Sequence, residues 1–296
     1  MPNFLDIKDL DKDQLSEIIL LAKNWKSKYP ENFLQNKNIL MIFEKPSLRT
    51  RVSFEVGIRQ LGGGVTILNS QEFKFGERES IFDTAKVLER YVDMIIIRSF
   101  DHSVLKEFAS IVNVPVINAL TDQSHPCQVA ADLLTLYETF GCLEDKKISW
   151  FGDCNNVTQS WIEASILYKF RLYIACPKNV SPNQETLKWI KQEKGNVIIT
   201  NDVYLAADGA DCILTDTWLS MGEEKTKSIE KFKPFQVDQK LMSFASKKAI
   251  FMHCLPAHRN FEVTSEVLEG NKSRVFDEAE NRLHVQKAII KYCFSE

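Results

Sequence analysis

A short stretch near the start of the chain combines two hydroxyls with a guanidinium, because Ser47, Arg49 and Thr50 lie within four residues of one another. The apolar run 39–43 precedes them, Pro46 ends that run, and the apolar residues that follow recur with the spacing of one helical face. This order predicts a strand, a sharp turn and a helix that begins at the three side chains. Unpaired backbone N–H groups, the helix dipole and a guanidinium together favour a phosphate or another dianion. An ordinary helix cap beside a solvated arginine pair is the alternative interpretation.

Polar residues also follow several other apolar runs, at the carboxyl ends of predicted strands, where open α/β sheets bind their ligands. A single arginine there is usually a surface ion pair and a single histidine is usually structural, so the group indicates a site only when taken together. The first half of the chain contributes cationic groups and the second half amide, carboxylate and thiol groups, which predicts two ligands. The residues are Arg98, His125, Gln128, Asp153, Asn155, Asn156, Asp216, Ser220, Met221, His253 and Cys254.

Three other kinds of site have weaker support in the sequence. The turn at Gly152 lacks the second and third glycines of a dinucleotide-binding motif. His253, Cys254 and His258 could ligate a metal, but no other cysteine or histidine lies at the spacing of a structural zinc site. Cys254 could be a nucleophile only with a nearby base and a lowered pKa, which the sequence does not establish. We therefore expect neither a metal nor a cofactor.

The elements that position these residues alternate between short apolar runs and amphipathic segments. The 296 residues are enough for two domains, and nearly unbroken apolar runs are typical of parallel strands covered on both faces. The sequence therefore predicts an α/β fold of two doubly wound parallel-sheet domains, joined by interdomain helices of which segment 128–140 is one. The expected strands are residues 39–43, 94–97, 114–120, 148–151, 172–176, 197–200, 212–214 and 249–252.

The composition limits which classes of binding partner and which cellular compartment we expect for this protein. A formal charge of −3 without a clustered basic segment argues against a nucleic-acid partner. Seven cysteines form no CxxC pair, which favours a reducing compartment, with the cytoplasm as the default. The first thirty residues mix one apolar helical face with many charges, so we expect neither a signal peptide nor a membrane span there.

Four motifs appear in order along the chain: residues 47–51 (SLRTR), 125–128 (HPCQ), 216–222 (DTWLSMG) and 253–256 (HCLP). Together they resemble the aspartate/ornithine carbamoyltransferase family over essentially the whole chain. The first two motifs resemble the wider family. The last two resemble its ornithine branch, because the aspartate enzymes have proline where Cys254 stands and lack the Ser-Met-Gly loop.

The resemblance implies a carbamoyl-phosphate domain at 1–140, to which a C-terminal helix at 282–296 returns, and an ornithine domain at 141–281. It implies a cytoplasmic homotrimer with shared active sites. It also implies transfer of a carbamoyl group from carbamoyl phosphate to the δ-amine of L-ornithine, in arginine biosynthesis or in the reverse, catabolic direction. A sister enzyme that acts on putrescine or an acylated ornithine, and a non-catalytic binding homologue, are the alternatives.

The resemblance also assigns roles to individual residues. The carbamoyl-phosphate residues are Ser47, Leu48, Arg49, Thr50, Lys74, Arg98, His125, Gln128, Cys254, Leu255 and Arg282, of which Arg49, Arg98, His125, Cys254 and Arg282 are catalytic. The ornithine residues are Asn156, Asp216, Ser220 and Met221. The chain departs from the family pattern at Lys74, where glutamine is usual, at Glu77-Arg78, where Arg-Gly is commoner, and at Leu48, where threonine is frequent.

Overall fold

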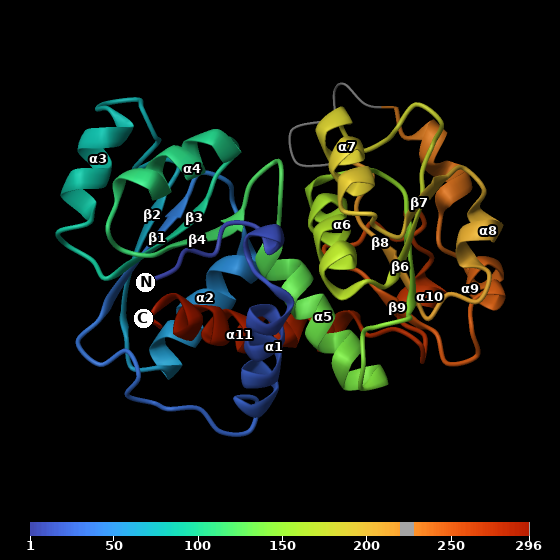
Figure 1. The fold of residues 1–296 in the computed structure, drawn as a ribbon, viewed down its shortest axis with the longest axis horizontal. Coiled ribbons are helices and arrows are strands. Elements are labelled where there is room, and N and C mark those ends of the chain that lie inside the picture. Colours follow the sequence, from blue (N-terminus) through green and yellow to red (C-terminus); the bar gives the residue numbers. More distant parts are fainter. Residues whose placement is uncertain (220–227, 296) are drawn as a thin grey trace. The chain divides into compact units, whose positions relative to one another are not determined.

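The computed structural model describes residues 1–219 and 228–295 (Figure 1). The chain divides into two compact units: unit 1 is Met1–Leu134 with Glu280–Glu296, and unit 2 is Thr135–Ala279. Each unit contains one parallel sheet with flanking helices. The predicted α/β fold of two doubly wound domains is confirmed.

Unit 1 holds, among its described residues, a four-stranded parallel sheet in the order β2-β1-β3-β4. The strands are β1 (Asn38–Phe43), β2 (Gly64–Asn69), β3 (Met94–Arg98) and β4 (Val116–Leu120). The short helices η1 (Ile7–Asp9) and α3 (Ile81–Leu88) and the longer α1 (Lys12–Asn24), α2 (Leu48–Gln60) and α4 (His102–Ile111) accompany them. The chain order reverses between β1 and β3, so the carboxyl ends of these two strands form a topological switch point, the usual ligand site of such sheets.

Strand β2 is absent from the sequence-based prediction. It lies at the edge of the sheet, beside β1 alone, and its residues are only partly buried, so it lacks the continuous apolar run of a central strand. Glycines precede it for a local reason. Gly62 has a φ of +83°, and a Cβ there would lie 2.4 Å from the carbonyl oxygen of Glu31, so only glycine fits.

Unit 2 holds, within the part that the structure describes, a five-stranded parallel sheet in the order β7-β6-β5-β8-β9. Its strands are β5 (Lys147–Phe151), β6 (Arg171–Ala175), β7 (Val197–Thr200), β8 (Cys212–Thr215) and β9 (Ile250–Met252). The chain order reverses between β5 and β8, which places the switch point at their carboxyl ends. The other elements are α6 (Asn156–Tyr168), α7 (Gln184–Gln192), α8 (Val203–Ala207), η2 (Glu230–Phe235), α9 (Gln239–Phe244) and α10 (Ser265–Leu268).

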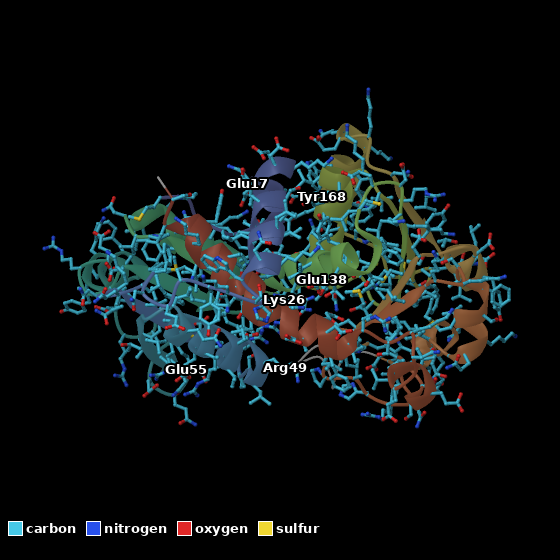
Figure 2. The ribbon with its side chains drawn as sticks, turned by 90° about the horizontal axis from the view of Figure 1, so that it is seen from below. Glu17, Lys26, Arg49, Glu55, Glu138 and Tyr168 are labelled. Carbon is cyan, nitrogen blue, oxygen red and sulfur yellow. The ribbon has the colours of Figure 1, made fainter. Side chains whose placement is uncertain are left out.

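Among the described elements, two helices contain residues of both units. α5 (Pro126–Phe140) begins in unit 1 and ends in unit 2, whereas α11 (Val275–Cys293) begins in unit 2 and ends in unit 1. Proline at the first position of α5 suits a helix start, because its missing N–H would have no partner there. Within unit 1, Lys26 donates to Asn281 of α11 at 2.8 Å, and both Lys26 and α11 are visible in Figure 2. No described helix is long and apolar enough to cross a membrane.

Candidate active site

The predicted strand, turn and helix at the first motif are confirmed. β1 ends at Phe43, α2 begins at Leu48, and Ser47 is the N-cap, with its Oγ accepting a hydrogen bond from the N–H of Thr50 at 3.3 Å. Lys45 braces the turn through an ion pair with Asp122. The first turn of α2 therefore presents the positive end of its dipole at the carboxyl end of β1.

Leu48 and Arg49 occupy the first two positions of α2. Leu48 is 73% exposed, so the side chain makes little contact within the chain and the backbone N–H is the group this position can offer to a ligand. Arg49 lies at the start of α2 in Figure 2, half-buried, and its guanidinium forms no ion pair with any residue that the structure describes. An arginine so placed can bind an anion at the helix N-terminus.

Arg282 links the C-terminal helix to the same turn. Its Nη2 donates to Oγ1 of Thr50 at 2.5 Å, and the two residues are 3% and 1% exposed. A buried, charge-assisted hydrogen bond of this kind fixes the orientation of the guanidinium. The sequence-predicted residues Thr50 and Arg282 are thus brought together although 232 positions separate them.

His125 lies close to two buried arginines. Arg98 ends β3 and His125 directly precedes α5, and these two residues and Arg282 are each at most 8% exposed. Burial, and then the charges of Arg282 and Arg98, hold the pKa of His125 well below its usual value. The imidazole is therefore neutral near pH 7, able to donate one hydrogen bond, while the arginines supply positive charge for an anion.

A buried network supports the segment that carries His125. Ser124 donates to Oδ1 of Asp6 at 2.5 Å, and Asn118 donates to Oγ of Ser124 at 3.0 Å. His102 lies 3.1 Å from Oδ2 of Asp6 and 2.9 Å from Oγ1 of Thr121. Burial raises the pKa of Asp6, but hydrogen bonds from His102 and Ser124 outweigh burial and bring the pKa below its usual value. This network was not foreseen, because its members are scattered over 120 residues.

The second motif continues into α5 with Cys127 and Gln128. The thiol of Cys127 donates to the carbonyl oxygen of Asn118 at 3.3 Å, and burial raises its pKa to about 12. This thiol is therefore a structural group rather than a nucleophile. Gln128 is fully buried, and its Nε2 donates to Oδ1 of Asp132, one turn along the helix, at 2.8 Å.

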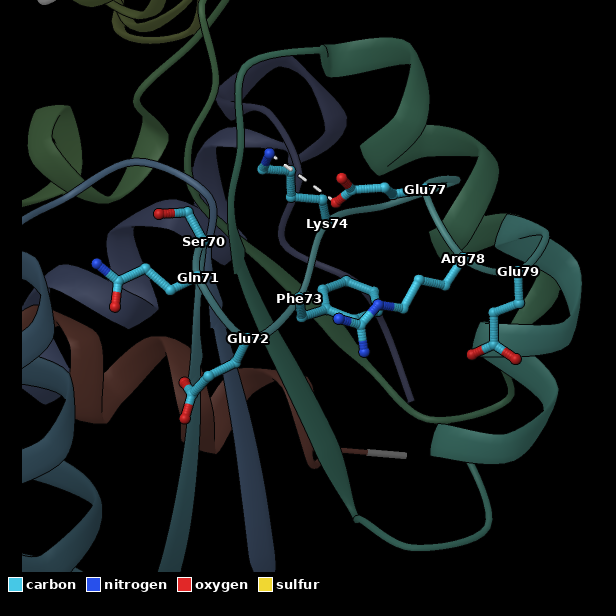
Figure 3. A pocket seen from close by; sticks show the side chains of 8 residues that line it. All are labelled: Ser70, Gln71, Glu72, Phe73, Lys74, Glu77, Arg78 and Glu79. Atoms are coloured by element: carbon cyan, nitrogen blue, oxygen red, sulfur yellow. Dashed lines mark ion pairs between the residues drawn. The ribbon is translucent and has the colours of Figure 1, made fainter.

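Lys74 lies in a surface loop of unit 1 that forms a pocket of about 230 Å³ (Figure 3). Phe73 and Phe75 flank Lys74 in the sequence and pack edge-to-face, with 5.0 Å between their ring centroids. The ring of Phe75 also packs against the buried Phe108, with 5.3 Å between the centroids. The Lys74 side chain between these packed rings is 55% exposed, and its Nζ lies 3.9 Å from Oε2 of Glu77. An exposed pair at this distance contributes little to stability, so Lys74 remains able to exchange Glu77 for another anion.

Unit 2 gathers three polar groups around Asp216, just after β8. Nδ2 of Asn155 donates to Oδ2 of Asp216 at 2.7 Å, the thiol of Cys254 donates to Oδ1 at 3.1 Å, and the N–H of Thr217 donates to Oδ1 at 2.7 Å. Asn155 is also the N-cap of α6, where its side chain accepts from the N–H groups of two following residues. The predicted ligand Asn156 is the first residue of α6, half-buried. Asn155 therefore contacts Asp216 directly.

Directly after β9, His253 forms hydrogen bonds with two buried glutamates. The N–H of His253 donates to Glu278 at 2.9 Å. Nδ1 of the His253 ring accepts a hydrogen bond from the N–H of Leu255 at 2.9 Å. The ring proton is therefore on Nε2, which donates to Glu262 at 3.2 Å. Leu255 is half-buried with a φ of +57°, an uncommon conformation for leucine that His253 helps to hold.

These contacts bear on the possible metal site. Asp216, His253 and Cys254 have ligand atoms within 4.8 Å of one another. Both ring nitrogens of His253 are already engaged, however, and a metal would have to displace Glu262 or the Leu255 N–H. His258, proposed from the sequence, is exposed and lies 3.8 Å from Glu262, outside this group. The residues therefore fit a metal poorly. Ser220 and Met221 lie outside the described residues.

Comparison with known proteins identifies the family. The model described as "Aspartate/ornithine carbamoyltransferase, carbamoyl-P binding domain" matches residues 2–138, and that described as "Aspartate/ornithine carbamoyltransferase, Asp/Orn binding domain" matches residues 144–293. The chain belongs to the aspartate/ornithine carbamoyltransferase family.

Several similar proteins in the family are named ornithine carbamoyltransferases. The Bradyrhizobium diazoefficiens protein is 48% identical over 297 residues, which cover 99% of this chain and 97% of that protein. The solved Pyrococcus furiosus structure has a TM-score of 0.93 at 40% identity, covering 98% of this chain and 96% of that one. The anabolic enzyme of Campylobacter jejuni has a TM-score of 0.93 at 38% identity, covering 99% of both chains.

Proposed function

We propose that this protein transfers the carbamoyl group of carbamoyl phosphate to the δ-amine of L-ornithine, giving L-citrulline and phosphate. The observation that carries the proposal is the similarity to ornithine carbamoyltransferases at 48% identity over nearly the full length of both proteins. The geometry of the two strand-end sites is consistent with it, because unit 1 offers cations and unit 2 a carboxylate.

Unit 1 supplies the groups that a carbamoyl donor needs. We assign the phosphate to the start of α2, where Ser47, Leu48, Arg49 and Thr50 offer N–H groups, hydroxyls and a guanidinium. The carbamoyl end is assigned to Arg98, His125, Gln128 and Arg282. In acyl transfer, negative charge develops on the carbonyl oxygen, and each preorganised donor aimed at it lowers the barrier by about 3 kcal/mol. A neutral His125 can donate to that oxygen without competing for the phosphate charge.

Unit 2 supplies the acceptor site in this proposal. Asp216 would pair with the α-ammonium of ornithine, and Asn156, Ser220 and Met221 are assigned to the amino acid by sequence resemblance. The δ-amine attacks as the neutral form and then loses a proton, for which the departing phosphate is a suitable acceptor. Cys254 and Leu255 are assigned to carbamoyl phosphate by resemblance alone.

The wider setting also follows from the resemblance. We propose a cytoplasmic homotrimer with shared active sites, in which Lys74 contributes a phosphate contact, and a role in arginine metabolism. The domain assignment is part of the same proposal: residues 1–140 with 282–296 bind carbamoyl phosphate, and 141–281 bind ornithine.

An acceptor panel tests the proposal. Citrulline or carbamoyl-product formation is measured with carbamoyl phosphate and with ornithine, putrescine, N-acetylornithine or aspartate as acceptor. A site that pairs a carboxylate with the α-ammonium should favour ornithine over N-acetylornithine, whose α-nitrogen is an uncharged amide, on the order of a hundredfold or more in kcat/KM. Putrescine keeps an ammonium at this position and lacks the α-carboxylate, so its rate tests the contacts assigned to that carboxylate. Preference for putrescine or the acylated amine would replace the proposal by a sister activity.

The alternative hypothesis is a protein that binds the same substrates without turning them over. A matched variant distinguishes it from an enzyme. Arg49→Ala removes a guanidinium from the phosphate site and should lower kcat/KM on the order of a thousandfold, with little change in unfolding free energy. If the unmodified protein binds carbamoyl phosphate but produces no carbamoylated acceptor, the catalytic proposal is wrong.

A further inference from the structure

Two cysteines follow neighbouring strands of the unit 2 sheet. β5 and β6 pair in parallel, with Phe151 opposite Ala175, so the residues after each strand emerge side by side at the carboxyl edge. Cys176 directly follows Ala175, and Cys154 lies three residues after Phe151. The strand register therefore brings together two thiols that are 22 positions apart in the sequence.

The two thiols lie close enough for the side chain of Cys154 to act on that of Cys176 as a hydrogen-bond donor. Cys176 is 2% exposed, and its Sγ lies 3.0 Å from the carbonyl oxygen of Val180. Cys154 is half-buried, so one member of the pair is accessible to a small reagent. The hydrogen bond from Cys154 lowers the pKa of Cys176 and outweighs the opposing effects of burial and of Asp153. The pair thus contains an accessible thiol beside one that is more readily deprotonated.

We propose that Cys154 and Cys176 form a redox-active pair that hydrogen peroxide oxidises to an intramolecular disulfide. Cys154, the accessible thiol, loses its proton to solvent, and its thiolate attacks one peroxide oxygen; the O–O bond breaks, and a sulfenic acid and hydroxide form. The sulfur of Cys176 then attacks the sulfenic sulfur and expels the second hydroxide. With the two thiol protons, the products are one disulfide and two waters. Because β5 and β6 are neighbours and the two residues follow their paired ends, the disulfide requires only a local displacement.

The disulfide would disturb the polar cluster around Asp216. Cys154 directly precedes Asn155, which caps α6 and donates to Asp216 at 2.7 Å. Drawing Cys154 toward Cys176 shifts the backbone from which the Asn155 side chain extends. Oxidation should therefore raise the KM for ornithine severalfold, with a smaller effect on the KM for carbamoyl phosphate. This kinetic consequence rests on the proposed function, whereas the disulfide itself does not.

Other cysteines define the controls. Cys142 is exposed and can form disulfides between chains, so the experiment uses Cys142→Ser as the parent protein. Cys254, which donates to Asp216, is a competing oxidation target near the same cluster. In the parent, Cys154→Ser and Cys176→Ser each remove one member of the proposed pair. Cys154→Ser changes a half-buried side chain, so it tests the proposal even if the buried Cys176→Ser fails to fold.

The test is peptide mapping after treatment of the folded parent with hydrogen peroxide and blocking of remaining thiols. We expect the protein to lose two hydrogens in mass, with a linkage between tryptic peptides 148–169 and 172–178 that dithiothreitol reverses. Neither single variant should form this linkage. A linkage through Cys254, or peroxide-treated parent that retains both thiols, would overturn the proposal. These outcomes are read by mass, so they do not depend on whether the protein turns over ornithine.

Discussion

Replacing Thr50 by valine tests how Arg282 is held in the unit 1 site. The two side chains have similar shapes, so the substitution removes the hydroxyl while filling the same space at a position that is 1% exposed. Nη2 of Arg282 then loses the acceptor that now lies 2.5 Å away. If the Thr50 hydroxyl orients Arg282 for the carbamoyl group, the variant should fold but react slowly.

The size of the effect follows from the type of hydrogen bond. Hydrogen bonds to charged groups contribute about 1.5–3 kcal/mol, and each 1.4 kcal/mol corresponds to about tenfold in an equilibrium or rate constant. Loss of this contact should therefore lower kcat/KM for carbamoyl phosphate by about 10- to 150-fold. The same loss should lower the unfolding free energy by about 1–3 kcal/mol, because a buried donor is left unsatisfied.

The assay measures initial rates of citrulline formation with carbamoyl phosphate varied at saturating ornithine, and urea unfolding on the same samples. Thr50→Ser is the matched control, because serine keeps the hydroxyl and should retain most of the activity. If Thr50→Val is folded and as active as Thr50→Ser, then the hydrogen bond to Arg282 does not serve the reaction.

Three further predictions concern other parts of the two sites. Asp216→Asn should raise the KM for ornithine far more than that for carbamoyl phosphate; if Asp216 only caps its turn, both constants will stay the same and stability will fall by ~1 kcal/mol. Asp6 lies beside His102, Lys106 and Asp9, and its pKa in the folded protein is lowered. The Asp6 carboxylate therefore stabilises the fold at pH values above its unfolded-state pKa, and this stabilisation is lost as the pH falls through the folded-state pKa. Asp6→Asn should then reduce the unfolding free energy at pH 7 and flatten its decline in acid, which urea titrations across pH would measure. Treatment with a chelator followed by dialysis should leave full activity; recovery upon adding a divalent metal after a loss would contradict the geometry around His253.

The parts predicted from sequence are those that local patterns determine. The central strands can be recognised in the sequence as unbroken apolar runs. Pro46 followed by Ser47 predicts the turn before α2 without any knowledge of tertiary contacts. Arg98 and His125 were predicted as site residues because they come after the apolar runs 94–97 and 114–120, and parallel strands carry their carboxyl ends to one edge of the sheet. In the structure Arg98 is the last residue of β3 itself.

The parts that sequence did not predict depend on contacts between distant residues or on partial burial. β2 is an edge strand without a continuous apolar run. Asn155 and Asn156 are adjacent amides, and only the cap geometry of α6 decides that Asn155 reaches Asp216. The supporting role of Glu262 is invisible locally, since a glutamate in a polar segment gives no sign that it will be buried beneath His253.

The most direct measurement of the central claim follows the carbamoyl carbon itself. Carbamoyl phosphate labelled with ¹³C at the carbonyl is mixed with L-ornithine and the protein, and the product is identified by ¹³C NMR and mass spectrometry. The account predicts that the label appears in the δ-ureido carbon of L-citrulline, with one phosphate released for each citrulline formed. Label found only in bicarbonate or cyanate, or on the α-nitrogen of ornithine, would contradict it.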